Sequence, residues 1–193
     1  MASTLVASFQ KDEMNIFYLH KDPKTCAEMH IDKHCVKMII EYAQLMSTAH
    51  RMLDGLEYEG RTKTGRRVKR WLCEDIAKEQ IVYKASHIHH PSAVWVRESA
   101  YQYWWLYQMW AHLCDEFTYR YGKQHLTDYK LRKVLREIPK NAPLNKKFTE
   151  PPQAMPDEVK VVGDSITAYR QYYMKHKRGF ATWKKDRKPE WFQ

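Results

Sequence analysis

Apolar and polar positions follow a helical period over much of the chain, most clearly across residues 24–53. Apolar side chains cover most of this expected helix, and the polar ones fall within about one third of its circumference at about 100° per residue. These polar residues are His30, Lys33, His34, Lys37, Glu41, Gln44, Thr48 and Arg51. A helix with so much apolar surface is expected to be surrounded by protein. We therefore expect its polar stripe to line a cleft, with a narrow solvent channel as the alternative.

Four members of the stripe could carry chemistry. His30, His34, Lys37 and Glu41 are spaced 4, 3 and 4 residues apart, so they are successive neighbours on one helix face. Partial burial of two imidazoles, an amine and a carboxylate can shift their pKa values, which is how enzymes obtain an acid, a base or an amine nucleophile at neutral pH. The alternative interpretation is a solvated stripe stabilised by ion pairs between neighbouring turns.

The remaining pattern predicts a mainly α-helical, compact bundle. Helices are expected at 71–84, 92–121 and 125–138, with Gly122 as a C-cap and a final helix beginning at the Asp164–Ser165 cap. Five prolines between 139 and 156 predict a long irregular connection. A length of 193 residues suits one domain. We expect this domain to cover 14–193, preceded by a flexible extension at 1–13, with Met14 as a possible alternative start.

The charge balance favours a polyanionic partner. Lys and Arg number 33 against 23 Asp and Glu, which gives a formal net charge of +10. Nucleic acid is the simplest such partner, because neutralised phosphates release condensed counterions. Residues 60–70 are expected to form a mobile basic loop that contacts phosphates, although solvated basic loops are also common. Its basic residues are Arg61, Lys63, Arg66, Arg67, Lys69 and Arg70.

Other segments could complete a nucleic-acid surface. Trp104 and Trp105 belong to an aromatic-rich helix in which some rings pack in the core and others could stack bases. Lys184 and Lys185 lie in a basic and aromatic C-terminal tail. His89 and His90 precede Pro91 at an expected helix N-terminus, where an anion is favoured, and His90 is also a candidate for catalysis.

Cysteine and histidine spacing gives a weaker indication of a metal site. Cys26, His30 and His34 follow one another at intervals of four residues, but no established zinc or di-iron motif is present. The four cysteines form no C-x-x-C pair and are expected to be free, buried thiols in a reducing cytoplasm. Glycine-rich nucleotide-binding motifs are absent from the sequence. We therefore expect no metal, no cofactor and no membrane association, and the oligomeric state is not predicted.

A set of short motifs carries a resemblance to known proteins. They are Asn15-Ile-Phe-Tyr-Leu, Asp32-Lys-His, Lys37, Glu41, Gln44, His90-Pro91, Trp95, Glu116, Arg120, Tyr121-Gly122 and Ala154-Met-Pro. From Met14 onward the chain resembles a family of small, largely uncharacterised phage and bacterial proteins. More distantly, its order of a short N-terminal segment, a helix with a glutamate and a His-Pro step is similar to the phage-type pyrimidine-dimer DNA glycosylases, which are small basic helical enzymes.

The second resemblance implies excision of a damaged or modified base from DNA rather than RNA. Glu41 would match the carboxylate that stabilises the sugar cation and assists proton transfer. Those glycosylases use an N-terminal threonine amine as nucleophile. Here the amine would belong to Ala2 or Met14, so Lys37 or a water molecule is the alternative nucleophile.

We therefore expect a DNA-processing enzyme of the cytoplasm, or of the host cytoplasm if the chain is phage-encoded. Its chemistry would be that of a DNA glycosylase or a related base-modifying enzyme. Two other functions are compatible with the sequence. One is a non-catalytic phage accessory protein that binds nucleic acid, and the other is a metal-dependent hydrolase of a nucleotide or small phosphorylated substrate.

Overall fold

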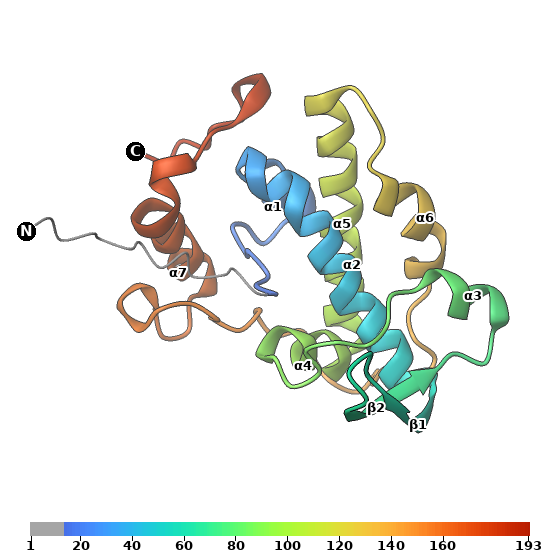
Figure 1. The fold of residues 1–193 in the computed structure, drawn as a ribbon. Helices are drawn as coiled ribbons and strands as arrows, with labels where there is room; N and C mark the ends of the chain where they lie inside the picture. The colour runs from blue at the N-terminus through green and yellow to red at the C-terminus, as the bar shows by residue number, and fades with distance from the viewer. Residues whose placement is uncertain (1–13) are drawn as a thin grey trace, which may run out of the picture.

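The computed structural model describes residues 14–193, and this part of the chain is mainly α-helical with a two-stranded sheet (Figure 1). The predicted fold class is confirmed, whereas the expected extension at 1–13 lies outside the described residues. The helices are α1 (Pro23–Glu28), α2 (Asp32–Asp54), α3 (Ile76–Ile81), α4 (Pro91–Glu98), α5 (Ala100–Tyr121), α6 (Leu126–Leu135) and α7 (Ser165–Tyr172). The strands are β1 (Leu56–Arg61) and β2 (Arg67–Leu72). Short helical turns are η1 (Asp157–Val159), η2 (Tyr173–Lys177), η3 (Arg178–Phe180) and η4 (Lys184–Asp186).

The two long helices, α2 and α5, pack against each other at the centre of the structure (Figure 1). The indole of Trp110 is fully buried between them and donates a hydrogen bond to the Ile39 carbonyl at 2.9 Å. Helices α1 and α4 also contact α5, and α6 covers α2 and α5 from another side. Most of the apolar surface of α2 therefore has the surrounding protein that the sequence pattern predicted, whereas Val36 and Ile40 are exposed.

Two expected helices are each divided into two. The segment 24–53 is interrupted at 29–31, where Ile31 is extended at φ −60° and ψ 154° before α2 begins. The segment 92–121 is interrupted at Ser99, which is extended at φ −154° and ψ 139° and whose hydroxyl caps α5 by accepting from the Tyr101 amide. The Ser99 hydroxyl also donates to the Lys146 carbonyl at 3.0 Å. This serine can hydrogen-bond backbone outside the helix, which explains why a continuous aromatic pattern contains a break.

The expected basic loop at 60–70 is instead part of a β-hairpin. Strands β1 and β2 are antiparallel and pair from Leu56↔Leu72 to Arg61↔Arg67. The connection, residues 62–66, contains Gly65, whose φ of +81° is a left-handed conformation that glycine adopts without strain. The Gly65 amide donates to the Thr62 carbonyl at 3.0 Å and closes the turn. Because β2 includes Trp71 and Leu72, the expected helix at 71–84 is reduced to α3.

Local capping signals are confirmed at two other helix ends. Gly122 ends α5 at φ +68°, and its amide bonds to the Thr118 carbonyl. The Asp164 side chain caps α7 by accepting from the Thr167 amide at 2.9 Å. The proline-containing connection between α6 and α7 is irregular apart from η1, as predicted.

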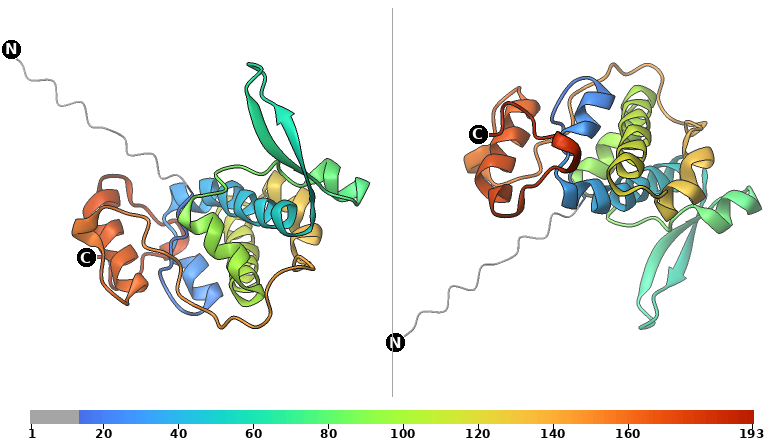
Figure 2. Two further views of the ribbon diagram at one scale, coloured as in Figure 1. Left: turned by 90° about the horizontal axis from the view of Figure 1, so that it is seen from below. Right: turned by 90° about the horizontal axis from the view of Figure 1, so that it is seen from above.

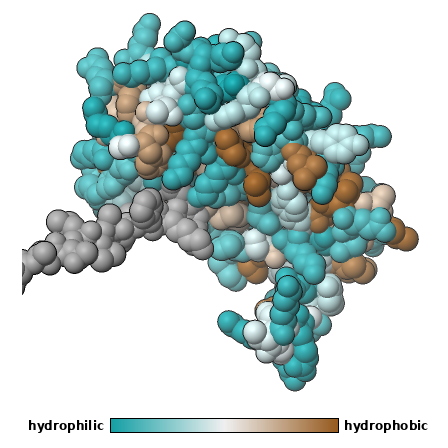
Figure 3. Space-filling view, turned by 45° about the horizontal axis from the view of Figure 1, so that its top comes forward, coloured by the Kyte–Doolittle hydropathy of each residue, from teal (hydrophilic) through white to brown (hydrophobic). Residues whose placement is uncertain are grey.

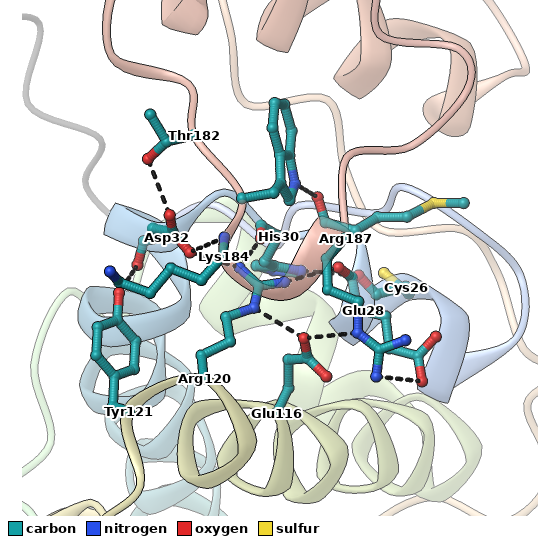
Figure 4. Close-up of polar contacts among 12 residues, drawn as sticks. Cys26, Glu28, His30, Asp32, Glu116, Arg120, Tyr121, Thr182, Lys184 and Arg187 are labelled. Carbon is teal, nitrogen blue, oxygen red and sulfur yellow. Dashed lines mark hydrogen bonds and ion pairs between the residues drawn. The ribbon is translucent and has the colours of Figure 1, made fainter.

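A buried ionic network attaches the C-terminal segment to the helices (Figure 4). Arg120 of α5 has no exposed side-chain surface, and its guanidinium bonds Glu116 at 2.8 Å and Asp32 at 3.1 Å. It also donates to the carbonyls of Glu28 and His30, both at 2.8 Å. These two carbonyls belong to the end of α1 and the break before α2. The Arg120 guanidinium therefore stabilises the non-helical backbone between α1 and α2.

The carboxylates of this network also bind the chain that follows α7. Asp32 accepts from the Lys184 amide at 3.0 Å and from the Thr182 hydroxyl at 2.9 Å, as Figure 4 shows. Glu116 accepts from the Arg187 side chain at 3.2 Å. The C-terminal segment is thereby fixed beside the start of α2.

No helix within residues 14–193 has the length and apolar character needed to cross a membrane.

Replacing Arg120 by Ala should cost about 3–5 kcal/mol in the free energy of unfolding, because Glu116 and Asp32 would keep buried charge without its partner. Urea denaturation followed by circular dichroism measures this. The matched control is Arg67→Ala in the exposed Arg67–Glu59 pair, which should cost less than about 1 kcal/mol. Equal losses in the two variants would contradict a central role for Arg120.

Candidate functional site

The part of the polar stripe that combines a carboxylate and an amine with access to solvent is the pair Lys37 and Glu41 on α2. The Lys37 Nζ lies 3.0 Å from Glu41 Oε1, and the Lys37 and Glu41 side chains are 40% and 17% exposed. The second carboxylate oxygen of Glu41 accepts a hydrogen bond from the Met14 backbone amide at 3.3 Å. Each oxygen of this carboxylate therefore has a donor within the described chain. Its small exposed fraction still leaves an approach for a ligand.

Further amines lie where α2 faces η2 and η3. The Lys33 Nζ lies 4.5 Å from the centre of the Phe180 ring. Lys177 is buried, and its Nζ lies 4.5 Å from the centre of the Tyr172 ring and 5.9 Å from that of Phe180. We call this group, made of Lys33, Lys37, Glu41, Lys177 and the two aromatic rings, the amine cluster. Within the described residues, the amine cluster thus brings three amines and one carboxylate to this face of α2.

His34 lies on the inner side of the amine cluster. Its ring is buried and stacks on Phe17 with centroids 4.2 Å apart, and its Nδ1 is 2.8 Å from the Tyr173 hydroxyl. The histidine thus connects α2 to the N-terminal extended segment and to η2. The prediction that His34 belongs near Lys37 and Glu41 agrees with the fold, but its ring is embedded rather than lining an open cleft.

His30 is a structural residue in this geometry. It is fully buried, with Nδ1 2.8 Å from the Cys26 carbonyl and Nε2 2.9 Å from the Tyr42 hydroxyl. Because the Cys26 carbonyl can only accept, His30 Nδ1 donates to it and Nε2 accepts from the Tyr42 hydroxyl, which in turn accepts from the Phe17 amide at 3.1 Å. Burial is the main cause that lowers the pKa of His30 to about 3. The expectation that His30 serves as a catalytic acid or base in a cleft is therefore corrected.

The far end of the stripe is also structural. Arg51 is buried and donates to the carbonyls of Trp71 and Val82 at 2.8 and 2.9 Å and to the Glu79 carboxylate at 2.6 Å. Thr48 is buried and accepts from the Ser86 amide at 3.3 Å. The stripe is therefore not a single cleft, because internal hydrogen bonds engage its two ends.

The histidines before α4 are placed as predicted, on the loop at its N-terminus. His90 is the N-cap residue, and its Nδ1 accepts from the Ser92 amide at 3.1 Å. His89 is exposed. His90 has a defined role in capping, and its place in catalysis stays a prediction.

The predicted nucleic-acid contacts fall on separate surfaces. The basic residues of the hairpin include Arg61, Lys63, Arg66, Arg67 and Lys69, which are exposed, and Arg70, which is partly buried beside Gly60. Lys184 and Lys185 are also exposed, and their Nζ atoms lie 5.7 and 5.8 Å from the rings of Tyr121 and Tyr119. Hydrophilic residues cover much of the face in Figure 3, including the arm that projects at its lower edge.

The two tryptophans proposed to stack bases have different environments. Trp105 is buried, donates to the Lys21 carbonyl at 2.9 Å and packs edge-on against Tyr18. It is therefore a core residue, which corrects the expectation for this position. Trp104 is partly exposed, stacks on Tyr107 and borders an open hollow with Tyr101 and Arg136.

The expected cysteine–histidine set does not form a metal site in the described structure. Cys26 is buried and its thiol donates to the Phe17 carbonyl at 3.3 Å, while both nitrogens of His30 have protein partners. Between residues 14 and 193, no three His, Cys, Asp or Glu side chains are grouped to hold a metal ion. All four cysteines are free and buried.

Three members of the site were missed at the level of the sequence. Tyr173, Lys177 and Phe180 reach α2 from more than 130 positions away in the chain. The C-terminal tail did show alternating basic and aromatic residues, but spacing alone does not indicate which distant helix they contact. Their role follows from the ionic network that fixes the C-terminal segment.

Comparisons with protein-family models, with curated proteins and with solved structures each return no match for this chain.

The buried histidines predict a loss of stability in mild acid. Burial lowers the pKa of both His30 and His50 to about 3, below the ordinary value of 6.5. The unfolded chain binds these protons below pH 6.5 and the folded chain does not, so stability is present above pH 6.5 and is lost as pH falls toward 3. Between about pH 6 and 5, each histidine should contribute about 1.4 kcal/mol per pH unit to the slope.

Urea denaturation at several pH values tests this expectation. His30→Gln should reduce the slope by the contribution of one proton, irrespective of its effect on stability at pH 7. A variant with the slope of the original protein would show that His30 is protonated in the folded state.

Proposed function

We propose that this protein is a DNA-processing enzyme that removes or modifies a damaged or altered base, with chemistry of the glycosylase type. The observation that supports this most is the geometry of Glu41, whose two oxygens lie against the Lys37 amine and the Met14 amide. The amine cluster around it would attract a phosphate backbone. The net charge of +10 favours the same partner. The proposed location is the cytoplasm.

Glu41 would act on the sugar of the target nucleotide. As the bond from C1′ to the base breaks, its electron pair leaves with the base, and the carboxylate stabilises the positive charge on the sugar. In a hydrolytic reaction, Glu41 would accept a proton from the water that attacks C1′. Glu41 suits this role because it is only 17% exposed and has oxygens held in position.

An amine could replace water as the nucleophile. Lys37 is the nearest side-chain amine to Glu41, and attack by its neutral form on C1′ would lead to a Schiff base after the sugar ring opens. The N-terminal amine is the second candidate, and it would belong to Ala2 after removal of Met1, or to Met14 if translation begins there. Borohydride would reduce either Schiff base to a stable adduct.

A non-catalytic nucleic-acid-binding protein is the second candidate function. It is favoured by the internal hydrogen bonds of His30, which remove one of the expected catalytic groups. It is also favoured by the exposed basic residues of the hairpin, which belong to a different element from Glu41.

The test is incubation with duplex and single-stranded DNA that carries a panel of damaged and modified pyrimidines, with and without borohydride. We expect release of a base or a trapped adduct, and at least a 100-fold slower reaction in Glu41→Gln because a positioned proton-transfer group is lost. DNA affinity should be unchanged in this variant. Peptide mapping of the adduct distinguishes Lys37 from the N-terminal amine.

The matched control is Lys130→Met on α6, an exposed lysine outside the amine cluster, which should keep full turnover. DNA binding without base release or adduct on any substrate of the panel would favour the non-catalytic function. Equal turnover of Glu41→Gln and the original protein would exclude Glu41 from the chemistry.

A further inference from the structure

The β1–β2 hairpin projects from the helical body as a separate arm. Figure 2 shows this in two views, with the ends of both strands next to α2 and α3 and the turn far from the other elements. Residues 56–72 contain six basic and two acidic side chains. A two-stranded ribbon of this exposure contributes little to the core beyond its end at Trp71, so the core does not account for the rest of its length.

The base of the arm is fixed to the body by buried groups. Arg51 of α2 donates to the Trp71 carbonyl at 2.8 Å, and Glu79 of α3 accepts from the Cys73 amide at 2.8 Å. Arg51 and Glu79 are themselves paired at 2.6 Å. The direction of the arm relative to α2 is therefore defined by this network.

The turn at the tip is also ordered. The Thr62 amide donates to the Arg66 carbonyl at 2.9 Å, and the Thr62 hydroxyl accepts from the Arg66 amide at 3.1 Å. Arg61 donates from its guanidinium to the Gly65 carbonyl at 3.1 Å. The backbone that carries the tip cations is thus held by its own hydrogen bonds, none of which uses the Lys63 side chain or the Arg66 side chain.

Charge increases from the base of the arm to its tip. Near the base, Glu57 pairs with Lys69 at 2.8 Å and Glu59 pairs with Arg67 at 3.4 Å. At the tip, the exposed side chains of Lys63 and Arg66 have no carboxylate partner within residues 14–193. Of the basic residues without a carboxylate partner in this part of the described chain, Arg61, Lys63 and Arg66 lie at the tip and Arg70 lies near the base, so most of the uncompensated charge is at the end farthest from the body.

We propose that this arm is a binding site for double-stranded nucleic acid and enters the major groove with its tip. Strands in a ribbon are about 5 Å apart, and the major groove is about 12 Å wide and admits such a ribbon, whereas the minor groove is about half as wide. Lys63 and Arg66 contact phosphates at the groove edges. The paired acids near the base stay outside the groove, which limits the depth of entry. This proposal extends the proposed function, because it presupposes DNA as the partner.

The test compares two double variants by fluorescence anisotropy with a labelled 20-base-pair duplex over a series of salt concentrations. Lys63→Ser with Arg66→Ser should reduce the slope of log Kd against log salt by about 2 and weaken binding about tenfold or more at 0.15 M salt. Lys130→Ser with Lys133→Ser removes the same charge from the exposed surface of α6 and should change the slope much less. Equal losses in the two variants, or no loss in the hairpin variant, would overturn the proposal.

Groove choice is tested with modified duplexes. Bulky substituents on C5 of the pyrimidines fill the major groove and should weaken binding, and a ligand that fills the minor groove should not. The opposite pattern would exclude entry into the major groove.

The two proposals fail in different ways. Turnover that depends on Glu41, with DNA affinity unchanged in the hairpin variant, would support the proposed enzyme and reject the proposed role of the arm. Affinity that depends on the arm, without base release on any substrate, would support the role of the arm and reject the proposed enzyme.

Discussion

The guanidinium of Arg120 is the interaction on which the arrangement of this protein most depends. It is fully buried and bonds two carboxylates and two backbone carbonyls that belong to α1, α2 and α5. A buried arginine is costly to desolvate, and it is stable here because its donors are matched by acceptors on several sides. The carboxylates of Asp32 and Glu116 can accept further hydrogen bonds, and they accept them from the C-terminal segment. One charge therefore determines both the break before α2 and the path of the chain after α7.

The position of the amine cluster follows from this constraint. Because the C-terminal segment is held beside the start of α2, Tyr173 reaches His34 and Lys177 lies near Phe180 and the α2 side chain of Lys33. These contacts reach α2 at Lys33 and His34, one turn before Lys37 on the helix. They add the positive charge of Lys33 and Lys177 to that of Lys37 at this end of α2.

Features fixed by neighbouring residues could be predicted from the sequence, whereas features fixed by distant contacts could not. Gly122 and Asp164 were identified because capping depends on a few adjacent residues, and Lys37 and Glu41 were paired because helix geometry places them together. The breaks at 29–31 and at Ser99 depend on acceptors and donors from remote segments. The hairpin was not predicted because its strands consist largely of basic residues and lack a clear alternation of apolar and polar positions. The turn sequence Lys63-Thr64-Gly65 could have indicated it. His30 and Arg51 share the polar face of Lys37, yet their partners come from other elements.

The geometry of α2 relates the two proposed contacts to one duplex. Glu41 lies 13 positions before the end of α2 at Asp54, and at 1.5 Å per residue this separates Glu41 from the start of the hairpin by about 20 Å. Base pairs in a duplex are stacked about 3.4 Å apart, so the distance corresponds to roughly six of them. A duplex that runs parallel to α2 would therefore meet the amine cluster and the base of the arm about half a turn apart. In this arrangement α2 would serve as a spacer. Arg51 bonds its end to the base of the hairpin, and His30, in the break before α2, bonds Tyr42 of α2.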